Sequence, residues 1–322
     1  MATKKQEELS RIGQNLLGYS KSSYRWEVVW KNVIIFSVLH ALALRGLYLY
    51  IFKAKIETMI FFWMYSWLGG FGITAGAHRL WSHRSYKAKT PLRYCLAAFQ
   101  CIAVQNHLYE WCRDHRVHHK FSETDADPHN AKRGFFFSHI GWLLLRKHPD
   151  VREKGKFIDM SDIAEDPVIK IQKKYYTPLV VLFRILVPLY VDCYLLGEKL
   201  GTAFYVMVVL SYIYSLHVTW LVNSAAHLFG NKPYDQSINP SQNRWVSIAS
   251  LGEGWHNFHH VFPWDYKANE LPFTSNWTTR FIHFWAALGQ AYDLKSVSAE
   301  LIKQRATRTG DGSLFKSATT VQ

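Results

Sequence analysis

Cysteine is scarce in this sequence of 322 residues. The four cysteines, Cys95, Cys101, Cys112 and Cys193, form neither a CxxC pair nor a regularly spaced framework. This pattern excludes a secreted fold held together by disulfides, and it provides no thiolate metal site. We expect the four side chains to be buried free thiols on a reducing side of a membrane.

Acidic residues are also few, because 24 Asp and Glu face 38 Lys and Arg, which gives a net charge of +14 with His counted as neutral. The basic residues are spread among apolar segments, so nucleic acid is the weakest candidate partner. Anionic lipid headgroups, a phosphate-bearing ligand and an acidic protein remain as candidates. Residues 1–24 contain no apolar run, and we expect them to be a flexible cytosolic tail with no cleavable signal peptide.

Long apolar runs, by contrast, are plentiful. Four stretches reach the roughly twenty residues that a membrane-spanning helix needs. Very short links join the first to the second and the third to the fourth, so each pair predicts a tight helical hairpin with its link on one side of the membrane. The other side then carries most of the Lys and Arg and should be cytosolic. The stretches are approximately 32–52, 58–77, 177–197 and 202–226.

These features predict an all-α integral membrane protein. Its four transmembrane helices form two hairpins, and a cytosolic helical cap covers them. We expect one domain, residues 25–292, followed by a polar C-terminal tail over residues 293–322. Both termini should be cytosolic.

Histidine is concentrated in four short clusters, which hold nine of the sixteen histidines. In HRVHH and HNFHH the spacing of three and four residues places three imidazoles on one helix face. In HRLWSH the two histidines are five apart, which splits them across a straight helix, so we expect this segment to unwind where it leaves the membrane. The nine residues are His78, His83, His115, His118, His119, His227, His256, His259 and His260.

The clusters indicate a metal centre on the cytosolic face. A single HxxHH can be an ordinary polar helix face, but the predicted topology brings all four clusters to the same side of the membrane. Nine imidazoles are too many for one tetrahedral zinc. Two ions, each with four or five nitrogens and with an open position between them, would account for all nine. Imidazole suits zinc, copper, iron and nickel, so the ligands alone do not select the metal.

The sequence motifs around the histidines resemble those of the membrane acyl-CoA desaturases of the stearoyl-CoA desaturase family, particularly the insect members. The likeness runs from about Trp26 to Tyr292. The matching stretches are GITAGAHRLWSHRSYKA, NHLYEWCRDHRVHHKFSETDADPHN, TWLVNSAAHLFG and LGEGWHNFHHVFPWDY.

The resemblance implies a di-iron enzyme of the endoplasmic reticulum membrane. Such an enzyme uses O2 and two electrons from cytochrome b5, which its own NADH-dependent reductase reduces, to insert a double bond into a saturated acyl-CoA. One iron would be held by His78, His83, His115, His119 and His259. The other would be held by His118, His227, His256 and His260, with Asn223 reaching it through water.

The resemblance also implies substrate residues. Those near the CoA and thioester end would be Asn32, Asn106, Arg113, Asp114, Arg146 and Lys147, and Trp220 would contact the acyl chain. The closed end of the acyl tunnel would lie along the second span, beside Ser66, Gly69 and Gly70. Small residues are also common where membrane helices pack together, which is the alternative interpretation.

Two other functions stay open. One is a di-iron membrane hydroxylase, which would add a hydroxyl group to the acyl chain. The other is a non-enzymatic membrane carrier of metal or haem, although a carrier should place its histidines at membrane depth. For a desaturase, delta-9 is the favoured bond position and delta-11 remains open. Bond geometry, preferred chain length, oligomeric state and physiological pathway do not follow from the sequence.

Overall fold

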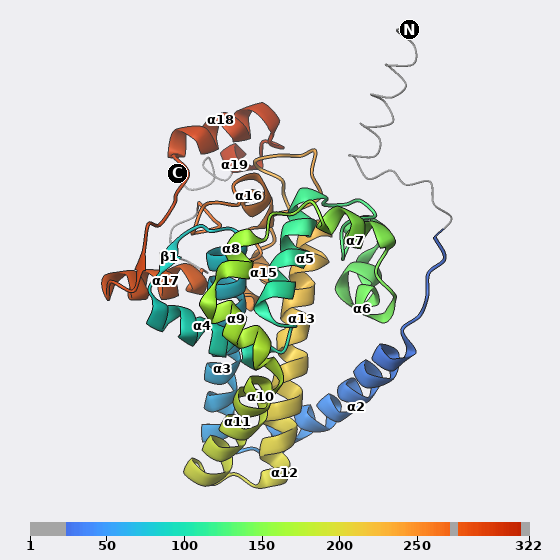
Figure 1. Ribbon diagram of the computed structural model, residues 1–322, viewed down its shortest axis with the longest axis vertical. Coiled ribbons are helices and arrows are strands. Elements are labelled where there is room, and N and C mark those ends of the chain that lie inside the picture. Colours follow the sequence, from blue (N-terminus) through green and yellow to red (C-terminus); the bar gives the residue numbers. More distant parts are fainter. Residues whose placement is uncertain (1–23, 271–275, 317–322) are drawn as a thin grey trace.

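The structure is a computed structural model that describes residues 24–270 and 276–316. Most of the predicted tail, residues 1–23, lies outside the described residues. The described chain is almost entirely helical, with one two-stranded sheet. Apolar helices form the lower part of the molecule in Figure 1, and shorter helices cover their upper ends. The helical fold class predicted from the sequence is therefore confirmed.

Three helical stretches within the described residues are long and apolar enough to cross a bilayer, which makes this a membrane protein. They are Trp30–Phe52, Tyr176–Leu195 and Leu200–Leu228, and each overlaps a predicted span. Apolar side chains point outward from them, as Leu44 and Tyr194 do with exposed fractions of 70% and 75%. An apolar surface of this kind suits contact with lipid.

The second predicted span, 58–77, differs from the other three. It lies in a continuous helix made of α3 (Ile56–Phe71) and the π-helix η1 (Gly72–Ser82), but it is not among the stretches of spanning length and hydropathy. Its Trp, Tyr and Gly residues lower its hydropathy, and every residue of η1 is buried within the protein. Four spans therefore remain a prediction.

Apart from α2, each apolar helix contains both α-helical and π-helical stretches. In Figure 1, α2 runs at an angle to the upright bundle of the others. The remaining bounds are α2 (Trp30–Phe52), α10 (Tyr176–Val180), η4 (Val181–Leu186), α11 (Val187–Leu189), η5 (Tyr190–Leu195), α12 (Leu200–Ala203), η6 (Phe204–Leu210), α13 (Ser211–Asn223) and α14 (Ala225–Leu228).

The two short links between the apolar helices contact each other. The backbone N–H of Lys55 donates to Glu198 Oε2 at 2.8 Å, and the hydroxyl of Thr58 donates to Asp192 Oδ1 at 2.7 Å. Both links therefore lie at one end of the bundle, as the predicted pair of hairpins requires. The histidine clusters lie toward the opposite end.

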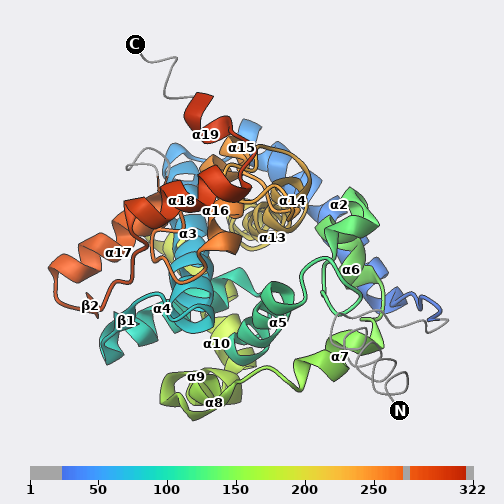
Figure 2. The same cartoon turned by 90° about the horizontal axis from the view of Figure 1, so that it is seen from above.

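The cap consists of short helices between and after the apolar ones. Figure 2 shows α16 and α18 over the ends of α3 and α13. Strand β1 (Lys87–Ala88) pairs antiparallel with β2 (Ala291–Tyr292). The helices are α4 (Thr90–Ala103), α5 (Leu108–Lys120), η2 (Ala131–Arg133), η3 (Phe137–Gly141), α6 (Trp142–Leu144), α7 (Pro149–Gly155), α8 (Ser161–Glu165), α9 (Pro167–Lys174), α15 (Arg244–Ala249), α16 (His256–Val261), α17 (Trp277–Ala287), α18 (Ala299–Thr309) and α19 (Ser313–Lys316).

Part of the predicted C-terminal tail is helical. Helix α18 begins after Ser298, whose hydroxyl accepts from the N–H of Leu301 at 3.3 Å as an N-terminal cap. Its buried Ala306 packs in an apolar cluster with Tyr234 and Phe262, close to α16. A domain boundary at residue 292 remains a prediction.

Candidate metal centre

The first histidine cluster lies at the end of a π-helix. In η1 the backbone hydrogen bonds close one residue later than in an α-helix, and the N–H of His83 donates to the carbonyl of His78 at 3.1 Å. Residues five apart therefore stack on one face. The expectation that this segment unwinds was wrong, because the helix widens instead and brings His78 and His83 together while keeping its hydrogen bonds.

The nine clustered histidines form two groups within which one ring nitrogen of each residue lies within 4.8 Å of the others. η1 and the residue after it provide two rings, α5 three, α14 one and α16 three. The first group is His78, His83, His115, His119 and His259, and the second is His118, His227, His256 and His260.

The nitrogen spacing in the first group fits a shared metal ion. The Nε2 atoms of His78 and His259 are 2.9 Å apart, those of His83 and His115 are 2.8 Å apart, and those of His119 and His259 are 3.1 Å apart. Two nitrogens in neighbouring octahedral positions, each about 2.1 Å from the metal, are about 3.0 Å apart, whereas tetrahedral positions give about 3.4 Å. The five nitrogens could therefore hold one ion together.

The second group has the same spacing. The Nε2 atoms of His227 and His256 are 3.0 Å apart, and those of His256 and His260 are 3.1 Å apart. The rings of His119 and His260 stack at 4.2 Å, and this contact joins the two groups. The arrangement thus fits two neighbouring ions held by nitrogen.

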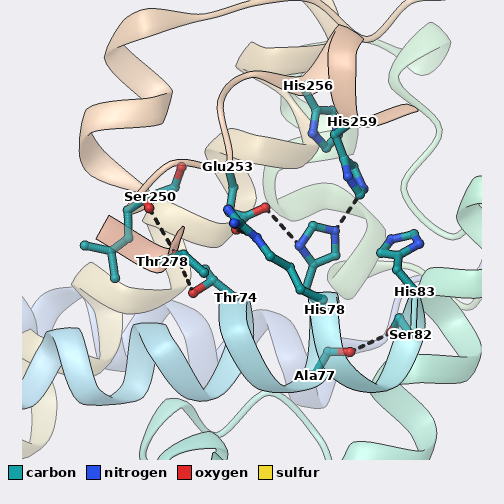
Figure 3. A network of polar contacts seen from close by, with 12 residues as sticks. Thr74, Ala77, His78, Ser82, His83, Ser250, Glu253, His256, His259 and Thr278 are labelled. Carbon is teal, nitrogen blue, oxygen red and sulfur yellow. Dashed lines mark hydrogen bonds and ion pairs between the residues drawn. The ribbon is translucent and has the colours of Figure 1, made fainter. Parts of the chain in front are cut away.

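Carboxylates contact the other nitrogen of three of these rings. Glu253 Oε2 lies 2.9 Å from Nδ1 of His78, Asp127 Oδ1 lies 2.9 Å from Nδ1 of His118, and Glu123 Oε1 lies 2.8 Å from Nδ1 of His227. In Figure 3, His78 lies between Glu253 on one side and His259 on the other. A proton on Nδ1 leaves the lone pair on Nε2, as metal ligation requires.

Glu253 is itself held by a buried arginine. Arg79 is 1% exposed, and its Nε and Nη2 donate to Glu253 Oε1 at 3.0 and 2.7 Å. Burial alone would raise the pKa of the Glu253 carboxyl, but Arg79 and His78 outweigh burial and lower this pKa to about 2. Glu253 is therefore ionised at neutral pH and accepts from both neighbours.

Burial keeps five of the clustered histidines neutral. It lowers the pKa of His115 and His119 on α5 and of His256, His259 and His260 on α16 well below the usual value, and neighbouring imidazoles lower each further. Metal ligation needs the neutral form.

A third group of possible ligands overlaps the second. Asp127 Oδ1 lies 3.5 Å from Nδ1 of His129 as well as beside His118. Because Asp127 contacts Nδ1 of His118, a ring of the second group, we interpret it as a support for that ring.

Two cavities meet beside the histidines. The larger has a volume of about 1120 Å³ and the smaller about 790 Å³. Both are lined by Trp111, His115, Thr219 and Asn223. A long ligand that occupies both cavities therefore passes the two histidine groups.

The larger cavity is lined by several of the predicted substrate residues, namely Asn32, Asn106, Asp114 and Trp220. The remaining three do not line it, although two of them contact Asp114 in its wall. Arg113 donates to Asp114 at 2.8 Å, and Lys147 forms an ion pair with the same carboxylate. Arg146 is largely exposed and pairs with Glu27 at 2.8 Å.

The small residues of α3 point in different directions. Ser66 and Gly70 line the smaller cavity. Gly69 faces α4, where a Cβ atom would lie 3.2 Å from Cγ2 of Ile102. Of the three residues proposed to limit chain length, two are thus placed at the cavity and Gly69 is not.

Sequence reasoning missed the polar partners of the site. Glu123, Asp127 and Glu253 all lie inside the motifs that carried the resemblance, at Asp and Glu positions to which no role was given. It also missed the contact between Gln105 and Thr219, where the amide donates to the hydroxyl at 2.8 Å in the wall of the larger cavity.

Buried histidine groups beside a long cavity, above membrane-spanning helices, define a membrane metalloenzyme. Residues 57–287 match the model of the fatty acid desaturase family. The chain therefore belongs to the fatty acid desaturase family, and it is an enzyme of the acyl-CoA desaturase group within it.

Three relatives illustrate the range of that group. The chain is 56% identical to an acyl-CoA Delta-9 desaturase of Acheta domesticus over 91% of this chain and 82% of that protein. It is 57% identical to an acyl-CoA Delta12-desaturase of the same species, over 90% of this chain and 82% of that protein. It is 53% identical to an acyl-CoA Delta(11) desaturase of Spodoptera littoralis, over 89% of this chain and 85% of that protein.

Proposed function

We propose that this chain inserts a double bond into a saturated acyl-CoA, using O2 and two electrons, with two iron ions held by the two histidine groups. The observation that carries this proposal is the pair of groups lying where the two cavities meet. Iron, when bound, supplies the O2-dependent redox chemistry that breaks strong aliphatic C–H bonds, which zinc lacks.

The chain's own residues bind and orient the substrate. Arg113 and Lys147 contact Asp114 in the wall of the larger cavity. Together with the exposed Arg146 they would bind the phosphates of CoA. Asn32, Asn106 and Asp114 would fix the thioester end, and Trp220 would contact the acyl chain. An extended chain held on both sides of the histidines presents one carbon pair to them, which is the positioning that selective oxidation requires.

The ligand assignment follows the two groups. His78, His83, His115, His119 and His259 would hold one ion, and His118, His227, His256 and His260 the other. Asn223 lines both cavities, and it would reach the second ion through water. Delta-9 is the favoured bond position, but relatives of similar identity include enzymes named for delta-9, delta-11 and delta-12, so delta-11 remains open.

We further propose that four spans in two hairpins place both termini and the cap in the cytosol at the endoplasmic reticulum, with a desaturase domain over residues 25–292. Electrons would come from cytochrome b5 and its NADH-dependent reductase. The net charge of +14 suits docking of an acidic partner.

Expression in a yeast strain that lacks its own desaturase tests the proposal. The strain should gain unsaturated fatty acids, and mass spectrometry should locate the double bond at one position. Replacing His118 with Ala should abolish the product, whereas His283→Ala, outside both groups, should retain it. Product from His118→Ala at the wild-type level would contradict the ligand assignment, and a hydroxylated product would identify a hydroxylase instead.

A further inference from the structure

An arginine lies buried within a membrane-spanning stretch. Arg184 belongs to η4 and is 5% exposed. In the part of the chain that the structure describes, no carboxylate forms an ion pair with it. An ionisable residue at such a position is costly and usually serves a function.

Arg184 donates to three oxygens from two neighbouring helices. Its Nη1 reaches the carbonyl of Ile102 at 3.3 Å, and its Nη2 reaches the carbonyl of Val208 and the hydroxyl of Ser211, both at 2.7 Å. Ile102 is in the last turn of α4, where carbonyl groups have no partner within the helix and the helix dipole is negative. A cation from the neighbouring span thus fastens the end of α4.

The turn after α4 has an unfavourable backbone. Val104 has φ 49° and ψ 52°, and Asn106 has φ 66°. The left-handed region is a genuine outlier for a β-branched residue such as Val104, and it persists only where the surroundings enforce it. The turn Val104–Asn106 therefore depends on its contacts.

Arg184 is part of those contacts. Besides its hydrogen bond to Ile102, its guanidinium carbon lies 5.4 Å from the centre of the Tyr212 ring, and the hydroxyl of Tyr212 donates to the carbonyl of Val104 at 3.3 Å. Arg184 thus supports the turn in two ways. It binds the end of α4 at Ile102, and it contacts Tyr212, which in turn binds Val104.

The same turn forms a wall of the larger cavity, since Val104, Gln105 and Asn106 all line it beside His115 and Asn223. Gln105 also binds Thr219 on the facing helix. A shift of the turn would therefore move the acyl chain relative to the histidine groups.

We propose that Arg184 is a positioning residue that holds the Val104–Asn106 turn in place and thereby fixes which carbon pair of the acyl chain lies beside the metal centre. The proposal rests on the proposed desaturase function. It assigns no direct contact between Arg184 and the substrate.

Two substitutions in the full-length protein, expressed in the desaturase-deficient yeast, test it. Arg184→Met removes the donors and keeps an unbranched side chain. It should reduce product per folded enzyme roughly tenfold and raise the ratio of displaced to main double-bond isomers at least about threefold. Arg184→Lys keeps a cation but lacks the planar guanidinium group. Its product yield and isomer ratio should lie between those of Arg184→Met and the wild type. The matched control is Arg45→Met, which removes an exposed arginine of α2 and should leave the isomer ratio unchanged.

The measurements separate the possible failures. Protein amount and iron content are measured on purified enzyme, so the isomer ratio is compared per folded molecule. If Arg184→Met does not accumulate, Tyr212→Phe replaces it, because this change removes only the hydroxyl that binds Val104, and a shift in isomer ratio is again expected. An unchanged ratio in the folded variants would overturn the inference, whereas absence of any double bond from the wild type would overturn the desaturase function itself.

Discussion

Replacing Gly70 with Leu should shorten the acyl chains that the enzyme accepts. Both Gly70 and Ser66 line the smaller cavity. A Cβ atom at residue 70 would lie 2.8 Å from Cδ1 of Leu251 across it. A leucine at residue 70 would therefore displace the end of the Leu251 side chain, project into the cavity and close off the part beside Ser66.

The size of the effect follows from helix geometry. Four residues separate Ser66 from Gly70, so the blocked length is about 6 Å of helix rise, or roughly four to five methylene groups. Each methylene that no longer fits changes discrimination by roughly tenfold or more. The optimum should move down by about four carbons, for example from eighteen-carbon to fourteen-carbon substrates.

The assay feeds saturated acids of fourteen, sixteen and eighteen carbons to the desaturase-deficient yeast and measures the products by gas chromatography and mass spectrometry. Gly70→Ala should shift the profile in the same direction to a smaller extent. Gly69→Ala is the matched control, since residue 69 faces Ile102 outside the cavity. The reasoning is refuted if Gly70→Leu accumulates normally and gives the wild-type profile, or if Gly69→Ala shifts it equally.

Three further changes test the polar parts of the site. Glu253→Gln removes the charge behind His78 and should lower metal affinity by roughly 10- to 100-fold, measured as bound iron per protein during titration with a chelator; unchanged retention would contradict the supporting role. Gln105→Leu removes the hydrogen bond to Thr219 and should lower kcat by roughly tenfold while the enzyme keeps its iron, and a normal kcat would show that this contact does not shape the cavity. Lys147→Met should raise KM for acyl-CoA by about tenfold with little change in kcat, because one cation is removed from the phosphate end, and a pure loss of kcat would place Lys147 elsewhere in the reaction.

The gathering of the histidine clusters at one end of the bundle could be predicted, because it depends on topology and on residue spacing within a helix. Residues three and four apart on α5 and α16 share a face in any regular helix. His78 and His83 could not be placed in the same way, since five residues match neither face of an α-helix. The sequence contains no strong signal that η1 adopts i to i+5 hydrogen bonds.

The supporting carboxylates were out of reach for a different reason. Glu253, Glu123 and Asp127 come from loops or turns, where spacing does not determine direction, and the chain contains 24 acidic residues. Their role appears only once burial and the ring nitrogens are known. Likewise, Gly69 and Gly70 are neighbours in sequence, and only the rotation of α3 about its axis decides which of them faces the cavity.

The close approach of the imidazoles has a consequence for folding. Ring nitrogens from different segments lie 2.8 to 3.1 Å apart, and a bound cation would hold them together through their lone pairs. One ion would cross-link η1, α5 and α16, and the other would cross-link α5, α14 and α16. These segments are separated by up to 181 residues in the chain. Such a cross-link stabilises the folded cap over the unfolded chain by mass action. We therefore expect iron supply to affect how much folded protein persists in the cell, as well as how fast the enzyme works. In cells starved of iron the protein should be degraded sooner, while its apolar helices are still in the membrane.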